Sequence, residues 1–287
     1  MELGRSGVNA GQIRAFLERH SLLARRDLGQ NFLCNAALAE RLVGLAGVEP
    51  GDTVLEVGTG LGILTRALAG RAARVVTLEV DAGLVRALRA ESLLPSNVEL
   101  LHADALAADL PGLVAAAGTP VRVVANLPYV ISGPLLRKLL DLHTALVDWS
   151  VMLQAEVGAR LLAESNTKAY GSLTVLHRLL VDVKREMKLS GGCFFPAPKV
   201  HSVFLRMRPL ARPALAAGEL PEVERFLRAA FGQRRKTLAN ALRGAGFDTD
   251  GLVQQLDALG IDPRARAESL APVELLALSR ELRKAPP

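Results

Sequence analysis

The chain has 287 residues, half of them apolar, and a net charge of +6, which suits one large domain with a smaller one and an acidic partner such as nucleic acid. Only two cysteines occur, Cys34 and Cys193, so a disulfide framework and a cysteine-rich zinc site are excluded and an intracellular, cytoplasmic protein is expected. No apolar run reaches the roughly 20 residues of a membrane helix, and the charged residues 1–26 do not resemble a secretory signal.

Apolar spacing predicts a helix over about 9–23, and a loop follows at 28–33. Short β-rich runs then alternate with helical stretches, which predicts an α/β fold with a parallel sheet covered on both faces. The predicted strands are 53–57, 74–80, 98–103, 121–126 and 149–154. The predicted helices between them end near 69 or span about 82–92 and 133–142.

The pattern changes after residue 180. Strands at 181–189 and 202–208 have no helix between them and are predicted to form a hairpin at one edge of the sheet. A Pro/Ala-rich linker follows, and only helical periodicity remains, with helices beginning near 223, 233, 250 and 272. We therefore expect a sheet domain at 1–210, with an N-terminal arm at 1–30, and a small all-helical domain at 211–287.

A glycine-rich loop, "LEVGTGLG" (55–62), joins the first strand of the sheet to the following helix. Gly58 and Gly60 let the backbone turn tightly and approach a ligand, and Glu79 ends the next strand, where it can accept from ribose hydroxyls. Ile63 stands where a dinucleotide-binding loop has its last glycine. The acidic Glu56 tolerates a positive charge, so S-adenosylmethionine is the favoured cofactor.

The strand at 121–126 delivers Asn126, Leu127, Pro128 and Tyr129 to the same edge of the sheet. Two acceptors, the Asn126 side-chain oxygen and a backbone carbonyl at Leu127 or Pro128, could grip the hydrogens of an exocyclic base amine and direct its lone pair at a methyl group. Tyr129 offers a face on which a flipped base can stack. Asp104, after the third strand, could accept from an adenine amino group, although alone it would more often cap a helix. The residues thus indicate methylation of a base amine.

These motifs resemble those of a known family, the ribosomal RNA adenine N6,N6-dimethyltransferases of the KsgA type. The resemblance covers nearly the whole chain, in order, and rests on "LGQNFL" (28–33), "LEVGTGLGILT" (55–65), "LEVD" (78–81), "ANLPY" (125–129), "MLQAEVGARL" (152–161), "FFPAPKVHS" (194–202) and "QRRKTL" (233–238). It implies a Rossmann-like class I methyltransferase sheet, a helical C-terminal domain, S-adenosylmethionine as cofactor, and 16S rRNA of the small ribosomal subunit or its precursor as substrate.

The resemblance also implies roles for single residues. Gln30, Asn31 and Leu33 would border the cofactor together with Gly58, and Phe194 would join Tyr129 around the target base. Glu79 would hold the ribose, Asp104 the adenine amine, and Asn126 both the methionine end and the target amine. His201 stands where the family usually has Asp, a difference that bears on substrate contacts.

The basic residues Arg234, Arg235 and Lys236 are predicted to lie on one helix and to contact RNA phosphates, the alternative being a solvated face. No histidine has metal-site partners by spacing, so His20, His102, His143 and His177 are expected at the surface or at strand ends, and no metal is expected. Trp149 is expected in the core. A monomer is expected.

Three other functions remain open. The first is an enzyme that methylates large-subunit rRNA and confers antibiotic resistance, which "ANLPY" and the extended "FFPAPKVHS" run make less favoured. The second is a DNA amine methyltransferase, which would more often have Pro in place of Leu127. The third is a ribosome assembly or transcription factor that keeps the fold without activity; the presence of Glu79, Asn126 and Tyr129 argues against it.

Overall fold

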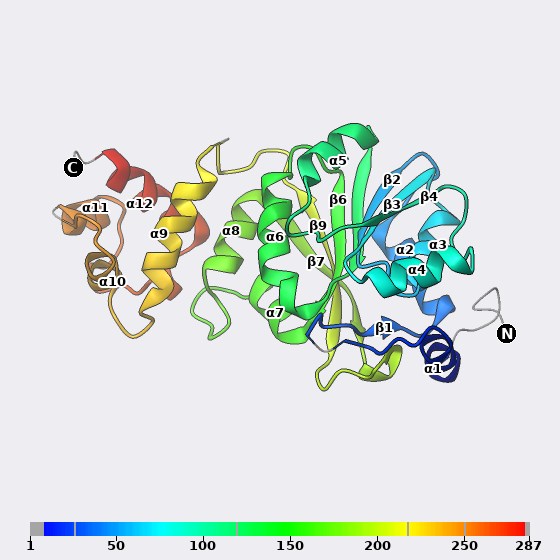
Figure 1. The fold of residues 1–287 in the computed structure, drawn as a ribbon. Helices are drawn as coiled ribbons and strands as arrows, with labels where there is room; N and C mark the ends of the chain where they lie inside the picture. Colours follow the sequence, from blue (N-terminus) through cyan, green and yellow to red (C-terminus); the bar gives the residue numbers. More distant parts are fainter. Residues whose placement is uncertain (1–8, 26, 119, 217, 250, 285–287) are drawn as a thin grey trace. The chain divides into compact units, whose positions relative to one another are not determined.

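The structure, a computed structural model, describes residues 9–25, 27–118, 120–216, 218–249 and 251–284 (Figure 1). They form two compact units. The first runs through Gly158 and also takes in Lys184–Arg208, and the second comprises Ala159–Val183 and the chain from Pro209 onward. The second unit thus includes a stretch from inside the domain predicted at 1–210, because a helix of that stretch packs on C-terminal helices.

The central sheet has seven strands in the order β4-β3-β2-β5-β6-β9-β7. They are β2 (Thr53–Val57), β3 (Arg74–Glu79), β4 (Val98–His102), β5 (Val121–Asn126), β6 (Asp148–Gln154), β7 (Val181–Leu189) and β9 (Ser202–Pro209). The pairs from β4 to β6 are parallel, as predicted, whereas β9 runs antiparallel to β6. The prediction that β7 and β9 are neighbours at one edge is confirmed. From β4, at one edge, the chain crosses to β5 on the far side of β2, and such a switch point is where α/β sheets bind ligands.

Several helices of the sheet unit begin at polar caps. The helices of this unit are α1 (Ala10–Arg19), α2 (Ala36–Ala46), α3 (Ile63–Ala69), α4 (Ala82–Ala90), α5 (Leu110–Ala117), α6 (Ser132–Asp141) and α7 (Ala155–Leu161), the last crossing into the second unit. Single 3-10 turns lie at Tyr129–Ile131 (η1) and Gly191–Cys193 (η2). The side chains of Asn35, Asp81 and Asp109 accept backbone N–H bonds in the first turns of α2, α4 and α5, which satisfies otherwise orphaned donors.

A separate two-stranded sheet joins two sequence motifs that lie far apart. β1 (Phe32–Leu33) pairs antiparallel with β8 (Phe194–Phe195), with Leu33 opposite Phe194. Both of these side chains are buried in one apolar cluster with residues of α1, including Phe16. The pairing therefore anchors the N-terminal segment against the loop that precedes β9.

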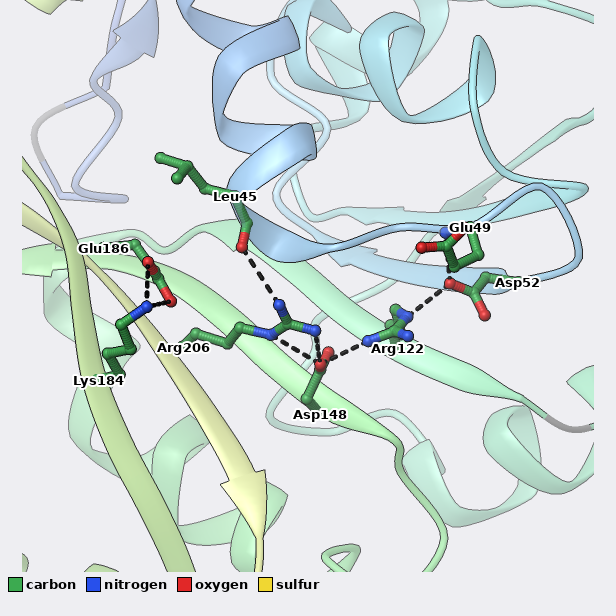
Figure 2. Close-up of polar contacts among 8 residues, drawn as sticks. All are labelled: Leu45, Glu49, Asp52, Arg122, Asp148, Lys184, Glu186 and Arg206. Atoms are coloured by element: carbon green, nitrogen blue, oxygen red, sulfur yellow. Dashed lines mark hydrogen bonds and ion pairs between the residues drawn. The ribbon is translucent and has the colours of Figure 1, made fainter.

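Four charged side chains, three of them buried and Arg206 nearly so, meet at the end of the sheet where the parallel strands begin (Figure 2). Arg122 of β5 donates to Asp52, just before β2, and to Asp148, the first residue of β6. Arg206 of β9 donates to the same Asp148 carboxylate and to the Leu45 carbonyl. Each arginine thus faces a carboxylate. Removing one partner of a buried ion pair leaves the other charge unpaired, which strongly destabilises the fold. The network links four strands away from the ends that form the site described below.

The described part of the second unit is helical apart from its connections and its portion of β7. The helices predicted from the sequence account for only some of its helices. This unit contains α8 (Ser172–Leu180), α9 (Leu220–Gly232), α10 (Leu238–Gly244), α11 (Leu252–Ala258), the 3-10 turn η3 (Ala267–Ser269) and α12 (Pro272–Lys284). The helix α8 was not predicted, and it packs on α9 and α12. The buried Tyr170 hydroxyl donates to the Leu270 carbonyl (2.8 Å), which ties the two segments of this unit together.

The prediction that Arg234, Arg235 and Lys236 lie on one helix is wrong. All three lie in the turn between α9 and α10. The physical reason is a helix start at Leu238: the Thr237 hydroxyl accepts a bond from a backbone N–H in the first turn of α10, a typical N-cap. The Arg234 guanidinium is engaged by Glu268 (2.8 Å), whereas Arg235 and Lys236 are exposed.

Two further expectations differ in outcome. Trp149 is fully buried in β6, as predicted. His177 is not at the surface or at a strand end, since it is fully buried within α8, where its Nδ1 contacts the Leu173 carbonyl at 2.8 Å. Among the described residues, no helix combines the length and apolar character needed to cross a membrane.

Candidate active site

A cavity opens in the sheet unit at the carboxyl ends of four parallel strands, β2 to β5. The loop before β1, these strand ends and η1 form its wall. Ten of the residues assigned to the site from the sequence line it: Gln30, Asn31, Gly58, Gly60, Glu79, Asp104, Asn126, Leu127, Pro128 and Tyr129. Apolar side chains that the sequence did not single out complete the wall, among them Leu28, Phe32, Val80, Ala105, Val130 and Ile131.

The glycine-rich loop turns at one wall of this cavity. Gly58 (φ +84°) and Gly60 (φ +56°) both have the left-handed backbone that favours glycine. A side chain at Gly60 would also press on the Phe32 ring, 3.1 Å from an added Cβ. The sequence therefore needs glycine at this position both for the turn and for the close packing of Phe32.

The carboxylate of Glu79 is nearly buried at the end of β3. One of its oxygens accepts the backbone N–H of Gly60 (2.8 Å), and the other accepts that of Asp81 (3.0 Å). Burial is the main influence on the pKa of Glu79 and raises it above its ordinary value, while these two bonds act in the opposite direction. Each carboxylate oxygen has further lone pairs, so Glu79 can accept from a ligand while it orders the loop.

The N-terminal segment is tied across the cavity by side-chain amides. Asn126 donates its Nδ2 to the Asn31 carbonyl (2.8 Å). Because a carbonyl can only accept, this bond fixes the orientation of the amide and leaves the Asn126 oxygen as an acceptor. Gln30 donates to the Asp81 carboxylate (3.1 Å) and accepts from the Arg25 backbone (2.9 Å).

The Asn-Leu-Pro-Tyr segment ends β5 and begins η1. Leu127 buries its side chain, so only its backbone is available to a ligand. The Pro128 carbonyl already accepts from Ile131 N (3.1 Å) and Ser132 Oγ (3.2 Å). Tyr129 is half-buried; burial raises the pKa of its phenol above the ordinary value, so the ring stays neutral at physiological pH.

Asp104 lies on the rim of the cavity, just after β4. It is exposed, and its Oδ1 accepts the backbone N–H of Leu106 (2.8 Å), which closes a local turn. Because α5, the next helix, is capped by Asp109, Asp104 closes this turn rather than capping a helix as the alternative had it. It also lines the cavity, and the two roles are compatible because a carboxylate has a second oxygen.

Three residues assigned to the site from the sequence do not line the cavity. Leu33 and Phe194 face each other across the β1–β8 pair and are buried in the apolar cluster, 4% and 3% exposed. Phe32, one residue before Leu33, lines the cavity instead, since neighbouring side chains of a strand point to opposite sides. The third is Glu56, whose side chain is fully enclosed.

Glu56 supports the glycine-rich loop from behind. Its Oε2 accepts from the hydroxyls of Thr65 (2.6 Å) and Thr77 (2.7 Å), and Thr77 in turn contacts Thr59 of the loop (2.7 Å). Burial raises the pKa of Glu56 to about 8. The carboxyl is therefore mainly neutral at pH 7, and the prediction that its charge accommodates a cationic cofactor is not supported by its placement.

Glu56→Gln is expected to flatten the pH dependence of stability. The folded state holds the Glu56 proton more tightly than the unfolded chain does, so protonation of Glu56 stabilises the fold. This stabilisation is complete below pH 4.5 and is lost as pH rises toward about 8. Over that range the wild-type melting temperature should fall by about 5 °C more than that of the variant. Thermal melts by circular dichroism at pH 5 to 9 test this, with the exposed Glu99→Gln as control. Parallel curves for wild type and Glu56→Gln would contradict it.

Comparison with known proteins assigns the chain to a family. The sequence profile described as ribosomal RNA adenine dimethylase matches residues 21–284. The chain belongs to this family. One relative, a ribosomal RNA small subunit methyltransferase A from Moorella thermoacetica, is 39% identical over 284 residues, which cover 96% of this chain and 99% of the relative. A second protein of that name, from Geobacter metallireducens, is 43% identical over 262 residues, 90% of this chain and 95% of the relative.

Solved structures agree with the family assignment. A dimethyladenosine transferase from Plasmodium falciparum superposes with a TM-score of 0.74 at 25% identity, over 87% of this chain and 96% of that one. The 23S rRNA methyltransferase ErmE superposes with a TM-score of 0.65 at 27% identity, over 88% of this chain and 100% of that one. The expected methyltransferase sheet, with a helical C-terminal region, is thus confirmed for this member of the family.

Proposed function

We propose that this adenine dimethylase transfers methyl groups from S-adenosylmethionine to the N6 of two adjacent adenines in 16S rRNA, twice per adenine, during small-subunit biogenesis. The observation that carries the proposal is that Asn126, Leu127, Pro128 and Tyr129 line the same cavity as Glu79 and the glycine-rich loop. A base-amine motif and a nucleoside-binding wall therefore share one site. The two relatives described above are both named small-subunit rRNA methyltransferases, which supports small-subunit rRNA as the substrate.

The residues of the cavity fit S-adenosylmethionine. A nearly buried carboxylate at the end of β3 suits a ribose, and Gly58 and Gly60 leave the loop backbone without a Cβ where a ligand would approach. Asp104 on the rim would accept from the adenine amine, and Gln30 and Asn31 would border the methionine part. When bound, the cofactor supplies a cationic sulfonium that carries the methyl group.

The protein's own groups would prepare the target amine. The Asn126 oxygen, free to accept because its amide nitrogen is held by Asn31, and one backbone carbonyl would bind the two amine hydrogens. Of the two candidate carbonyls, Leu127 is the better, because that of Pro128 already accepts two bonds. Gripping both hydrogens favours a pyramidal nitrogen whose lone pair is free to attack, so catalysis is mainly alignment and electrostatics. Tyr129 would stack on the flipped adenine.

The proposal is tested with small ribosomal subunits that lack adenine dimethylation. The protein is incubated with them and labelled S-adenosylmethionine, and the modified bases are mapped by mass spectrometry. Two adjacent dimethyladenines in 16S rRNA are expected, with no label in large subunits treated in parallel. Label confined to large subunits would favour the alternative, and no label in either would favour a factor without activity. We further propose that the protein acts in the cytoplasm as a monomer. Light scattering of the purified protein measures its mass and so tests the monomeric state.

Arg234, Arg235 and Lys236 are proposed to contact the phosphates of the subunit RNA. Since Arg234 is already paired with Glu268, the exposed Arg235 and Lys236 should contribute most. Changing both to Gln is expected to lower the slope of log affinity against log salt by about two, because each lost phosphate contact releases about one counterion fewer. Binding to small subunits over a salt series measures this slope.

The matched control removes the same charge elsewhere in the second unit. Arg228, on α9, is paired with Glu224, and Arg243, on α10, bonds Thr249. The double change of these two arginines to Gln should alter the slope less than the change at Arg235 and Lys236. Equal slopes for the two double variants would mean that only net charge matters and that the turn makes no local phosphate contact.

A further inference from the structure

A single side-chain hydrogen bond joins the proposed base-stacking residue to a distant strand. The Tyr129 hydroxyl lies 2.7 Å from Ser202 Oγ. Tyr129 begins η1 after β5, whereas Ser202 is the first residue of β9. The bond therefore connects two elements that the chain order separates and that are not neighbouring strands in the sheet, since β6 lies between β5 and β9.

Ser202 is the fixed partner in this contact. It is 1% exposed and stands opposite Gln154 in the antiparallel β6–β9 register. The carbonyl of the preceding residue, His201, accepts the Ala155 backbone N–H at 2.9 Å, so the backbone just before β9 is hydrogen-bonded as well. A buried residue within a sheet has little freedom to move, and its hydroxyl can act as a rigid point of attachment.

Tyr129 is the partner that needs holding. Its ring lines the cavity in a single 3-10 turn, whose next residue, Val130, is 60% exposed. The Pro128 turn constrains the backbone of Tyr129, whereas the rotation of the ring about its side-chain bonds is set by the contacts that the side chain itself makes. Stacking requires a defined plane, and an anchored phenol oxygen at the far end of the ring restricts the plane that the ring can adopt.

We infer that Ser202 is a positioning residue, whose hydroxyl holds the Tyr129 ring in the plane that receives the target adenine. The inference rests on the proposed function, because it assigns a role within the same site. The loop before β9 thus reaches the site at its end although Phe194 is buried away from the cavity, because the loop ends at His201, directly before Ser202. Ser202 acts on the base only through Tyr129.

The test is a double-mutant cycle on methylation of undermethylated small subunits. Ser202→Ala and Tyr129→Phe each remove the same bond from one side, and each should lower kcat by about fivefold, the effect of one buried neutral hydrogen bond. The affinity for S-adenosylmethionine should not change. Because both variants delete one contact, the double variant should be no slower than either single variant. Ser202→Thr keeps the hydroxyl and should restore most of the rate.

A buried serine elsewhere in the sheet provides the control. Ser150 is fully buried in β6, and its hydroxyl has no hydrogen-bond partner within the described part of the chain. Ser150→Ala should leave kcat unchanged, and melting temperatures identify any variant that fails to fold. If the rate losses of Ser202→Ala and Tyr129→Phe multiply in the double variant, the inference is overturned while the proposed function stands. The same holds if either single variant keeps the wild-type rate. Wild-type protein that methylates no adenine in small subunits would overturn both.

Discussion

Tyr129→Ala is expected to slow adenine methylation by about ten- to a hundredfold. Stacking of a base on an aromatic ring contributes roughly 1 to 3 kcal/mol, and alanine offers no face for it. The cofactor should still bind with nearly unchanged affinity, because the glycine-rich loop and the Glu79 carboxylate belong to other strands of the cavity wall. Single-turnover methylation of small subunits measures the rate, and calorimetry measures binding of S-adenosylmethionine.

The comparison of Tyr129→Ala with Tyr129→Phe separates the ring from its hydroxyl. Phenylalanine keeps the stacking face and loses only the bond to Ser202, so its defect should be the smaller of the two. If purified Tyr129→Ala methylates subunits at the wild-type rate, the stacking role is wrong. If it loses cofactor affinity to the same extent as rate, Tyr129 serves the cofactor rather than the base.

Glu79→Ala is expected to weaken S-adenosylmethionine binding by about ten- to a hundredfold. Hydrogen bonds to a charged group contribute about 1.5 to 3 kcal/mol, and the variant loses those that the ribose would make. It also leaves the Gly60 and Asp81 backbone N–H groups without their acceptor, which loosens the loop at the cavity wall. Calorimetry with S-adenosylmethionine gives the affinity directly.

A second glutamate controls for the loss of charge. Glu99, on the neighbouring strand β4, is about half exposed, pairs with Arg74 and does not line the cavity. Glu99→Ala should therefore bind the cofactor as the wild type does. Unchanged affinity in Glu79→Ala, or equal losses in the two variants, would remove the ribose assignment.

The strands of the sheet could be predicted because each is a short apolar run bounded by loop residues. Thr53–Val57 and Val121–Asn126 were located to the residue, and the order of strands and helices alone implied parallel pairing. The same logic placed the glycine-rich loop, Glu79 and Asn126 at one edge. These residues follow strands, and the carboxyl ends of parallel strands meet wherever the sheet forms.

Side-chain direction at the edges of the site could not be predicted in the same way. Leu33 and Phe194 point into the core because β1 pairs with β8, a contact between segments far apart in the chain that no local pattern encodes. Glu56 has the residue type of a ligand contact, yet its enclosure by Thr65 and Thr77 depends on how β2, β3 and α3 pack. The helix expected at Arg234 is a turn because Thr237 caps a helix that begins only at Leu238, and a lone threonine in a basic stretch does not by itself indicate a cap.

The second compact unit has a consequence for how this protein can be divided or recombined. Its helices come from two separate stretches of chain, Ala159–Val183 and the part after Pro209, and α8 of the first stretch packs on α9 and α12 of the second. A fragment cut at residue 210 would carry α8 with its apolar face, including Val175 and Leu179, stripped of those partners. The complementary C-terminal fragment would lack a wall of its core. The second unit therefore cannot be exchanged between relatives by a single crossover. A chimaera that retains both folds needs two junctions, one on each side of Ala159–Val183, as well as the junction after β9.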